Sequence, residues 1–87
     1  MKDPYTILRY PLSTEKAVRE MEASNSLIFV VDRSANKDQI KKATEKAFDV
    51  KVIKVRTMIG PNNKKRAYIK LHADYPAIDI TTQLGLI

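Results

Sequence analysis

Cysteine is absent from this 87-residue sequence, glycine occurs only twice and histidine once. Without cysteine the chain cannot form disulfide bonds, cysteine-ligated zinc sites or iron–sulfur clusters. The two glycines, Gly60 and Gly85, cannot make a glycine-rich phosphate loop, and no serine stands in a nucleophile-elbow motif. His72 has no second histidine and no cysteine with which to bind a transition metal. We therefore expect no catalytic residues, no metal and no cofactor.

Long hydrophobic segments are also missing. The longest uninterrupted run, Leu27 to Val31, is far too short to span a bilayer. Charges at Lys2, Asp3 and Arg9 interrupt the first ten residues, which is unlike a signal peptide. We expect a soluble, intracellular protein that does not insert into membranes. With 44% hydrophobic and 30% charged residues, the chain has the composition of one globular domain over residues 1–87.

Positive charge is concentrated in the middle of the chain. Lysine and arginine number 16 against 10 aspartate and glutamate residues, which gives a net charge of +6. Residues 33–70 hold 12 of the basic residues and 3 of the acidic ones, whereas the remainder of the chain is mildly acidic. A basic segment of this kind is typical of a surface that binds a polyanion, although a solvated lysine-rich surface gives the same composition. We favour nucleic acid as the partner.

Two segments have the spacing of amphipathic helices. The first is expected to begin after Ser13 or Thr14 as the N-cap and to end in the turn at residues 24–26. The second is expected over residues 37–49. Asn36 precedes it, and Asn36 with Gln39 resembles a capping box. A last short helix is expected over residues 78–84, with the glycine behind it as its cap.

Four other segments have the composition of strands, namely residues 5–10, 27–31, 50–59 and 65–72. Residues 27–31 show no alternation of apolar and polar side chains, so they are expected to form a central strand. Residues 5–10 end at Pro11 and are expected to form an edge strand, where proline is tolerated. The third is expected to slip in register or to start late, because its first valines are out of phase with the rest. Its remaining core-facing side chains are expected to be Ile53, Val55, Thr57 and Ile59.

The order of these elements is β-α-β-α-β-β with a short C-terminal helix. It predicts an α/β sandwich of the α+β type around a four-stranded, largely antiparallel sheet. Many activities occur on sheets of this kind, so the fold alone does not assign a function.

One candidate polyanion site lies on the second expected helix. Its lysines recur at spacings of four and five, away from the apolar positions, and share one broad face: Lys37, Lys41, Lys42 and Lys46. Ammonium groups in this arrangement can follow a phosphate backbone. The alternative interpretation is a solvated helix face on which Glu45 is a local partner.

The second candidate site is the hairpin of the last two expected strands. Alternation places cations around an aromatic ring on one face or rim of the sheet, next to a basic turn: Lys54, Arg56, Arg66, Tyr68 and Lys70, with Asn62, Asn63, Lys64 and Lys65. Cations around an aromatic ring suit phosphate contact and the stacking of a base or ribose. The alternative is that Tyr68 packs under the helices while its neighbours extend to solvent.

Two other classes of function stay open. A small acylphosphatase-like enzyme would need an arginine in a phosphate-cradling loop, and the nearest candidates, Arg9 and Arg33, have no glycine-rich loop beside them. A protein-interaction module that does not bind RNA would use the acidic first helix, with Glu15, Glu20 and Glu22. Such a module would bind protein in a salt-insensitive way.

Four segments, in order, resemble one known family. They are Pro11 to Ala17 (PLSTEKA), residues 37–55, Ala67 to Leu71 (AYIKL) and the tail from Ala77 to Ile87. At these positions the chain is similar to the universal family of large-subunit ribosomal protein twenty-three. Its tail is similar to the archaeal and eukaryotic ending, and the likeness covers nearly the whole chain.

The resemblance implies a non-enzymatic protein that binds large-subunit ribosomal RNA beside the exit of the polypeptide tunnel. It also implies neighbouring ribosomal proteins as partners, a docking surface for nascent-chain factors such as the signal recognition particle, and no obligate homo-oligomer. In bacterial members a glutamate of the Ser/Thr-Glu-Lys motif contacts the chaperone trigger factor, and the matching position here is Glu15. Archaeal-type proteins work without that chaperone, so we expect Glu15 to serve other tunnel-exit factors.

Two departures from the family pattern indicate the archaeal type. The bacterial form has a long basic extension between its last two strands, whereas this connection spans only residues 60–65. The eukaryotic form carries a long basic N-terminal extension, whereas this chain starts almost at its first expected strand. We therefore expect the archaeal type, on cytoplasmic ribosomes, with no lining of the tunnel by the hairpin.

Overall fold

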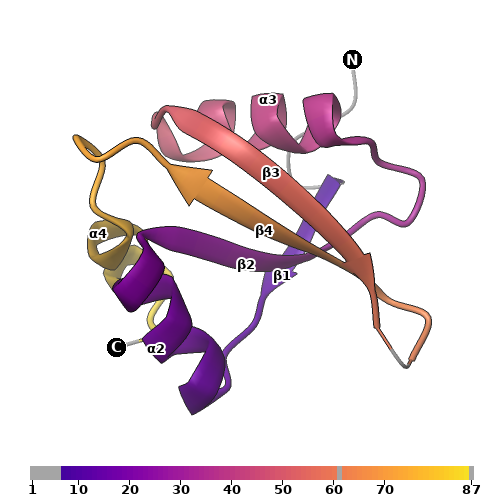
Figure 1. Ribbon diagram of the computed structural model, residues 1–87, viewed down its shortest axis with the longest axis horizontal. Coiled ribbons are helices and arrows are strands. Elements are labelled where there is room, and N and C mark those ends of the chain that lie inside the picture. The colour runs from indigo at the N-terminus through magenta and orange to yellow at the C-terminus, as the bar shows by residue number, and fades with distance from the viewer. Residues whose placement is uncertain (1–6, 61, 87) are drawn as a thin grey trace.

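The computed structural model describes residues 7–60 and 62–86, and it shows one sheet with helices packed against it (Figure 1). The elements in chain order are β1 (Leu8–Pro11), α2 (Glu15–Ser24), β2 (Ser26–Val31), α3 (Lys37–Phe48), β3 (Val52–Ile59), β4 (Lys65–Leu71) and α4 (Ala77–Gln83). The strands lie in the order β1-β2-β4-β3, and every neighbouring pair is antiparallel. These observations confirm the expected α+β fold, with β1 at an edge and β2 in the interior.

The two faces of the sheet are covered unequally. On one face, α3 packs over the larger core, which takes side chains from all the strands and from α4. On the other face, α2 packs on β2, where Ala17 and Met21 contact Ile28. The part of this second face that belongs to β3 and β4 carries exposed side chains and lies beside α2 rather than under it (Figure 1).

Local hydrogen bonds fix the helix ends where the sequence indicates them. The hydroxyl oxygen of Thr14 accepts the Ala17 N–H at 3.2 Å. Asn36 and Gln39 form a reciprocal capping box, with N···O distances of 2.8 and 3.0 Å. Gly85, with a φ of 73°, follows α4 and closes its last turn. None of the helices within the described residues is long and apolar enough to cross a membrane.

Strand β3 departs from the expected pattern. It begins at Val52, later than expected, and its register against β4 shifts between Val52 and Lys54. The expectation that Ile53 and Ile59 face the core is wrong, because their exposed fractions are 57% and 54%. The register shift places Val52 and Val55 in the core three positions apart, so Ile53 turns away from it. Ile59 lies at the end of an edge strand, next to the hairpin turn.

Several other boundaries differ from those expected, most of them by a single residue. Strand β1 continues through Pro11, because proline is tolerated on an edge strand. Residues 5 and 6 of the expected first strand lie outside the described residues. Strand β4 ends at Leu71 and helix α4 ends at Gln83, each one residue earlier than expected.

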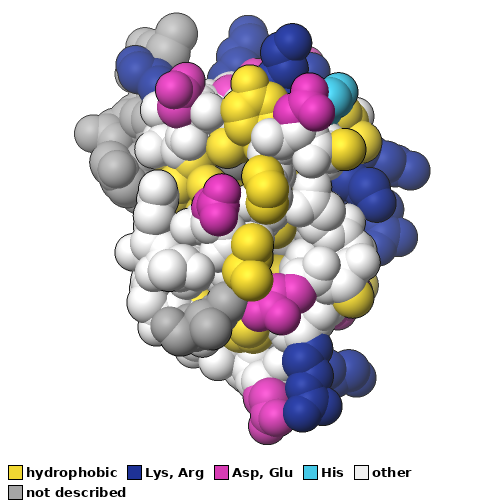
Figure 2. Space-filling view, turned by 90° about the vertical axis from the view of Figure 1, so that its left-hand side faces the viewer, with side chains coloured by type: hydrophobic (Ala, Val, Ile, Leu, Met, Phe, Trp, Pro, Cys, Tyr) yellow, Lys and Arg dark blue, Asp and Glu magenta, His cyan; other side chains and the backbone are white. Residues whose placement is uncertain are grey.

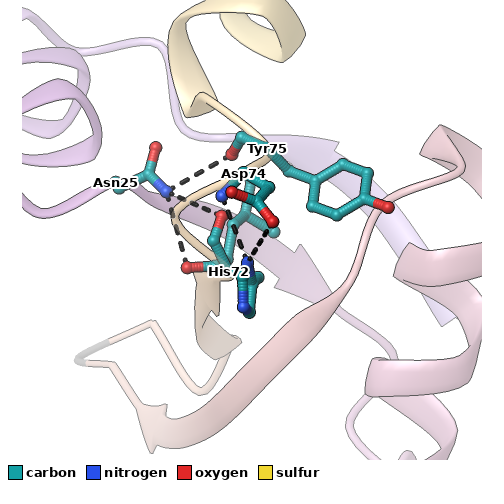
Figure 3. Close-up of polar contacts among 5 residues, drawn as sticks. Asn25, His72, Asp74 and Tyr75 are labelled. Carbon is teal, nitrogen blue, oxygen red and sulfur yellow. Dashed lines mark hydrogen bonds and ion pairs between the residues drawn. The ribbon is translucent and has the colours of Figure 1, made fainter.

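One side chain ties the end of α2 to the segment between β4 and α4 (Figure 3). Asn25 ends α2 in the left-handed conformation, with a φ of 51°. Its side-chain nitrogen donates to three backbone carbonyls at 3.3 to 3.4 Å, those of Leu71, His72 and Tyr75. Its side-chain oxygen accepts the Ala77 N–H at 2.6 Å. A single carboxamide therefore anchors the end of β4 and the start of α4.

Candidate nucleic-acid interface

The lysines of α3 point away from the sheet. Ile40, on the opposite side of the helix, is fully buried in the larger core. Asp38, an acidic residue in the first turn of the helix, is exposed to solvent. So are all four predicted lysines, namely Lys37, Lys41, Lys42 and Lys46. Glu45 does not neutralise them, since its carboxylate accepts the Val52 N–H at 3.1 Å. No described acidic side chain lies within ion-pair distance of these lysines, so their charge is available to an anionic partner.

The open part of the sheet carries the second group of cations. The register places Lys54 directly opposite Lys70 and Arg56 directly opposite Tyr68, so these side chains share one face of the hairpin, as the alternation predicts. These four side chains line a hollow of about 270 Å³, here named the sheet hollow, together with Glu20 and Ser24 of α2 and Ser26 and Ile28 of β2. Among the described lining residues, three cations outnumber a single carboxylate. Like charges directly opposite one another on a sheet repel. An anion bound between Lys54 and Lys70 would relieve that repulsion.

Tyr68 has a structural role as well as a place in the sheet hollow. Its half-buried side chain packs against the cluster formed by Ala17, Met21 and Ile28. The Arg56 guanidinium carbon lies 5.5 Å from the centroid of the Tyr68 ring, within cation–π range. The ring therefore supports a guanidinium group over the sheet, which is a geometry suited to phosphate contact.

The three consecutive cations of the hairpin diverge from one another. Lys64 is exposed, and its ammonium donates to the Tyr10 hydroxyl at 2.9 Å. Lys65 points to the other side of the sheet, where its ammonium donates to the Ala35 carbonyl at 2.6 Å. Arg66 is half-buried. The exposed turn residues Asn62 and Asn63 complete the predicted set, and Asn63 takes the left-handed conformation with a φ of 61°.

A second hollow contains cations that the sequence analysis left out of its RNA-binding set. Arg9 on β1 and Arg33 after β2 line it together with Lys64 and Lys65, and its volume is about 280 Å³. We name it the basic hollow. Arg9 and Arg33 are isolated arginines in the sequence, and only the strand order and the register bring them close together.

The side of the molecule that carries α2 and α4 has a different character. Figure 2 shows this side, where hydrophobic side chains run in a line with acidic side chains beside them and most lysines and arginines lie toward the margins. Glu15 begins α2, its side chain is 80% exposed, and its carboxylate pairs with Arg19 at 2.7 Å. Ile78 and Asp79 on α4 are also exposed. This side is suited to a protein partner rather than to RNA.

His72 lies just after β4, beside Asp74 (Figure 3). Its Nδ1 accepts the Asp74 N–H at 3.1 Å and lies 3.5 Å from the Asp74 carboxylate. The residues that the structure describes contain no group of three or more histidine, cysteine, aspartate or glutamate side chains that could hold a metal ion. His72 therefore belongs to the turn that Asn25 anchors.

The family assignment follows from the match of residues 6–78 to the model of the family "Ribosomal protein L23". The chain belongs to the ribosomal protein L23 family. The large ribosomal subunit protein uL23 of Trypanosoma brucei brucei is 48% identical over 85 residues, which cover 98% of this chain and 52% of that protein. The large ribosomal subunit protein uL23A of Caenorhabditis elegans is 44% identical over 85 residues, which cover 98% of this chain and 58% of that protein. The chain thus spans about half the length of these relatives.

Membership of the L23 family confirms the resemblance seen in the sequence. The matched region extends from just before β1 into the first turn of α4. It therefore includes α3, the sheet hollow and the basic hollow. The two relatives named above are eukaryotic.

Proposed function

We propose that this chain is a non-catalytic component of the large ribosomal subunit and binds large-subunit ribosomal RNA beside the polypeptide exit tunnel, in cytoplasmic ribosomes. The observation that carries the proposal is the set of exposed cations on α3 and on the open sheet, within a chain of the L23 family. The relatives are named as large ribosomal subunit proteins, which supports the same role here.

The proposed mechanism is electrostatic and depends on shape. The α3 lysines and the residues of the sheet hollow bind phosphates where RNA segments pack together, and the larger core holds both surfaces in fixed positions. RNA helices are recognised mainly through their backbone and shape. Binding should weaken steeply with salt, with a log–log slope of about −0.7 for each phosphate contacted on a single strand. A slope near zero would contradict the proposal.

Sedimentation tests the assignment to the ribosome. A tagged copy is expressed in the source cells, and the lysate is fractionated on a sucrose gradient before and after a wash at raised salt. We expect the protein to travel with large subunits and to resist the wash. Migration of the protein alone, near its own mass of 9.9 kDa, would overturn the proposal.

The side that carries α2 and α4 is proposed to dock nascent-chain factors such as the signal recognition particle, with Glu15 in the contact. The support is the exposure of Glu15 on α2, together with the acidic and apolar surface on the side of the molecule that Figure 2 shows. A photoreactive amino acid at position 15 in assembled ribosomes should crosslink to such factors. The same group at the exposed Lys51, on another part of the surface, is the matched control. Crosslinks from position 51 but not from position 15 would contradict this contact.

We also propose that the chain is of the archaeal type. The short connection between β3 and β4 supports this, because it differs from the long extension of the bacterial form. Expression of a tagged copy in archaeal, bacterial and eukaryotic cells is the test. We expect the copy to sediment with the large subunits of the archaeal cells. Sedimentation with bacterial or eukaryotic large subunits, but not with archaeal ones, would contradict the archaeal type.

A further inference from the structure

The basic hollow is built by segments that are far apart in the sequence. Strand β1 contributes Arg9 and Tyr10, the segment after β2 contributes Arg33, and the hairpin contributes Asn63 and Lys64. The sheet order brings them together, because β2 lies between β1 and β4. The hollow therefore lies at the end of the sheet where β1 begins, β2 ends and the hairpin turns.

A shift in the register between β1 and β2 directs the Arg9 side chain into the basic hollow. In the β1–β2 pair, Leu8 is opposite Val31 and Tyr10 is opposite Val30, so Arg9 is the extra residue of a bulge. A bulge locally changes the direction of a side chain. As a result Arg9 and Tyr10, although adjacent in sequence, both line the hollow.

The described charged side chains that line the basic hollow are all positive. None of its described lining residues is acidic, and neither Arg9 nor Arg33 pairs with a described carboxylate. The carboxylate of the nearby Asp32 accepts the Ser34 N–H and hydroxyl at 3.1 Å. The Lys64 ammonium is held by the Tyr10 hydroxyl at the edge of the hollow.

The lining groups match the donors that bind phosphate. A guanidinium group presents a planar fork of N–H donors that fits the oxygens of a phosphate, and an ammonium adds a compact charge. The Lys64 and Lys65 ammonium groups each donate one hydrogen bond within the protein, to the Tyr10 hydroxyl and the Ala35 carbonyl, and each has further N–H donors. Arg9 and Arg33 form no ion pair with a described carboxylate, so they are the principal groups left to contact an anion.

We propose that the basic hollow is a separate site for the phosphodiester backbone of RNA, with Arg9 and Arg33 as its principal contacts. The inference deepens the proposed ribosomal RNA binding and rests on it. The site adds contacts from β1 and from the β2–α3 connection, neither of which belongs to the α3 array or to the sheet hollow. The basic hollow lies where β2 ends, whereas the sheet hollow is lined by Ser26 and Ile28 from the first half of β2, so the two sites are distinct.

The test measures how the affinity for a single-stranded uridine dodecamer depends on salt. The double variant Arg9→Gln with Arg33→Gln is compared with the wild type and with a matched control, Lys16→Gln with Lys51→Gln, which removes the same charge from exposed positions outside the hollow. We expect the slope of log K against log salt to become less negative by about 1.4 in the arginine variant, because two phosphate contacts are lost. The control should change the slope far less, and all proteins should have the same circular dichroism spectrum.

Each outcome bears on a different claim. Equal slopes for the arginine variant and the control would overturn the basic hollow as a site while the proposed function stands. The absence of salt-dependent RNA binding by the wild type would overturn the proposed function and the hollow together. A glutamate dodecamer serves as a polyanion without phosphate. If the wild type binds it as tightly as the uridine dodecamer, the assignment to a phosphodiester is wrong.

Chemical shifts locate the contact independently of the variants. In isotope-labelled wild-type protein, the guanidinium Nε signals of Arg9 and Arg33 should move on addition of the uridine dodecamer. The Arg19 signal, from a residue paired with Glu15 on α2, should stay unchanged. Shifts of Arg19 as large as those of Arg9 and Arg33 would show diffuse attraction and overturn the site.

Discussion

The side-chain oxygen of Asn25 accepts the Ala77 N–H at 2.6 Å and so joins α2 to α4 across 52 positions of the chain. The Asn25→Ala substitution removes this hydrogen bond and the three hydrogen bonds that the same carboxamide donates. It also places an alanine in the left-handed conformation. We expect the free energy of unfolding in urea to fall by about 2 to 4 kcal/mol, from backbone strain and unsatisfied polar groups.

A second variant separates these two causes. Asn25→Gly keeps the backbone conformation accessible but lacks the carboxamide, so it should recover only about 1 kcal/mol of the loss. If Asn25→Ala unfolds at the same urea concentration as the wild type, the carboxamide does not stabilise the fold.

Neighbouring lysines of the hairpin should respond differently to substitution. The Lys65 ammonium is bonded to the Ala35 carbonyl and its side chain is half-buried, whereas Lys64 is exposed. We expect Lys65→Gln to lower the free energy of unfolding by about 1 to 2 kcal/mol. Lys64→Gln should change it by less than about 0.5 kcal/mol. Urea denaturation compares the two, and equal effects would mean that the Lys65 bond adds no stability.

The Lys54–Lys70 pair should give opposite effects on folding and on binding. These lysines are directly opposite each other on adjacent strands. Lys54→Glu replaces repulsion with attraction, so stability should rise by about 0.2 to 1 kcal/mol. Affinity for RNA should fall, because the sheet hollow loses a cation and gains an anion. Lys51→Glu, which makes the same change outside the sheet hollow, is the control for binding. A Lys54→Glu variant that binds RNA as well as this control would exclude the sheet hollow as a contact.

The α3 surface should be required for assembly rather than for folding. Lys41→Glu with Lys46→Glu reverses two exposed charges and leaves the buried face of the helix unchanged. The variant should keep its circular dichroism spectrum and lose its place in the large-subunit fractions of a sucrose gradient. Lys16→Glu with Lys51→Glu should still sediment with the subunit. Normal sedimentation of the α3 variant would show that this helix is not a principal RNA contact.

Features that depend on neighbouring residues could be predicted from the sequence. Thr14 and Asn36 cap helices through bonds that span three residues, so their residue types are sufficient evidence. Central strand β2 was predictable because an unbroken apolar run indicates burial on both faces. The presence of Lys54, Arg56, Tyr68 and Lys70 on one face of the hairpin was predictable from a short turn and simple alternation, whereas their exact pairing comes from the register of the sheet.

Features that depend on register or on distant partners could not be predicted in this way. Ile53 and Ile59 fit the alternation of a core strand, but the register shift and the edge position expose them. The divergence of Lys64 from Lys65 depends on acceptors elsewhere in the fold, at Tyr10 and Ala35. The basic hollow needs both the strand order and the β1 bulge, and neither has a clear signal in one sequence.

The strand order β1-β2-β4-β3 has a consequence for synthesis of the chain. Because β4 is the third strand across the sheet but the last to be made, it must enter between β2 and β3, and it is the only described strand that β3 pairs with. A nascent chain that has emerged only as far as β3 contains the β1–β2 pair and β3, but it lacks β4, the strand that joins them. Closure of the sheet therefore waits for residues 65–71, and the two hollows, which both require the hairpin, form with it. In this protein the surfaces proposed for RNA binding are assembled late, so an incomplete chain would not present them to RNA.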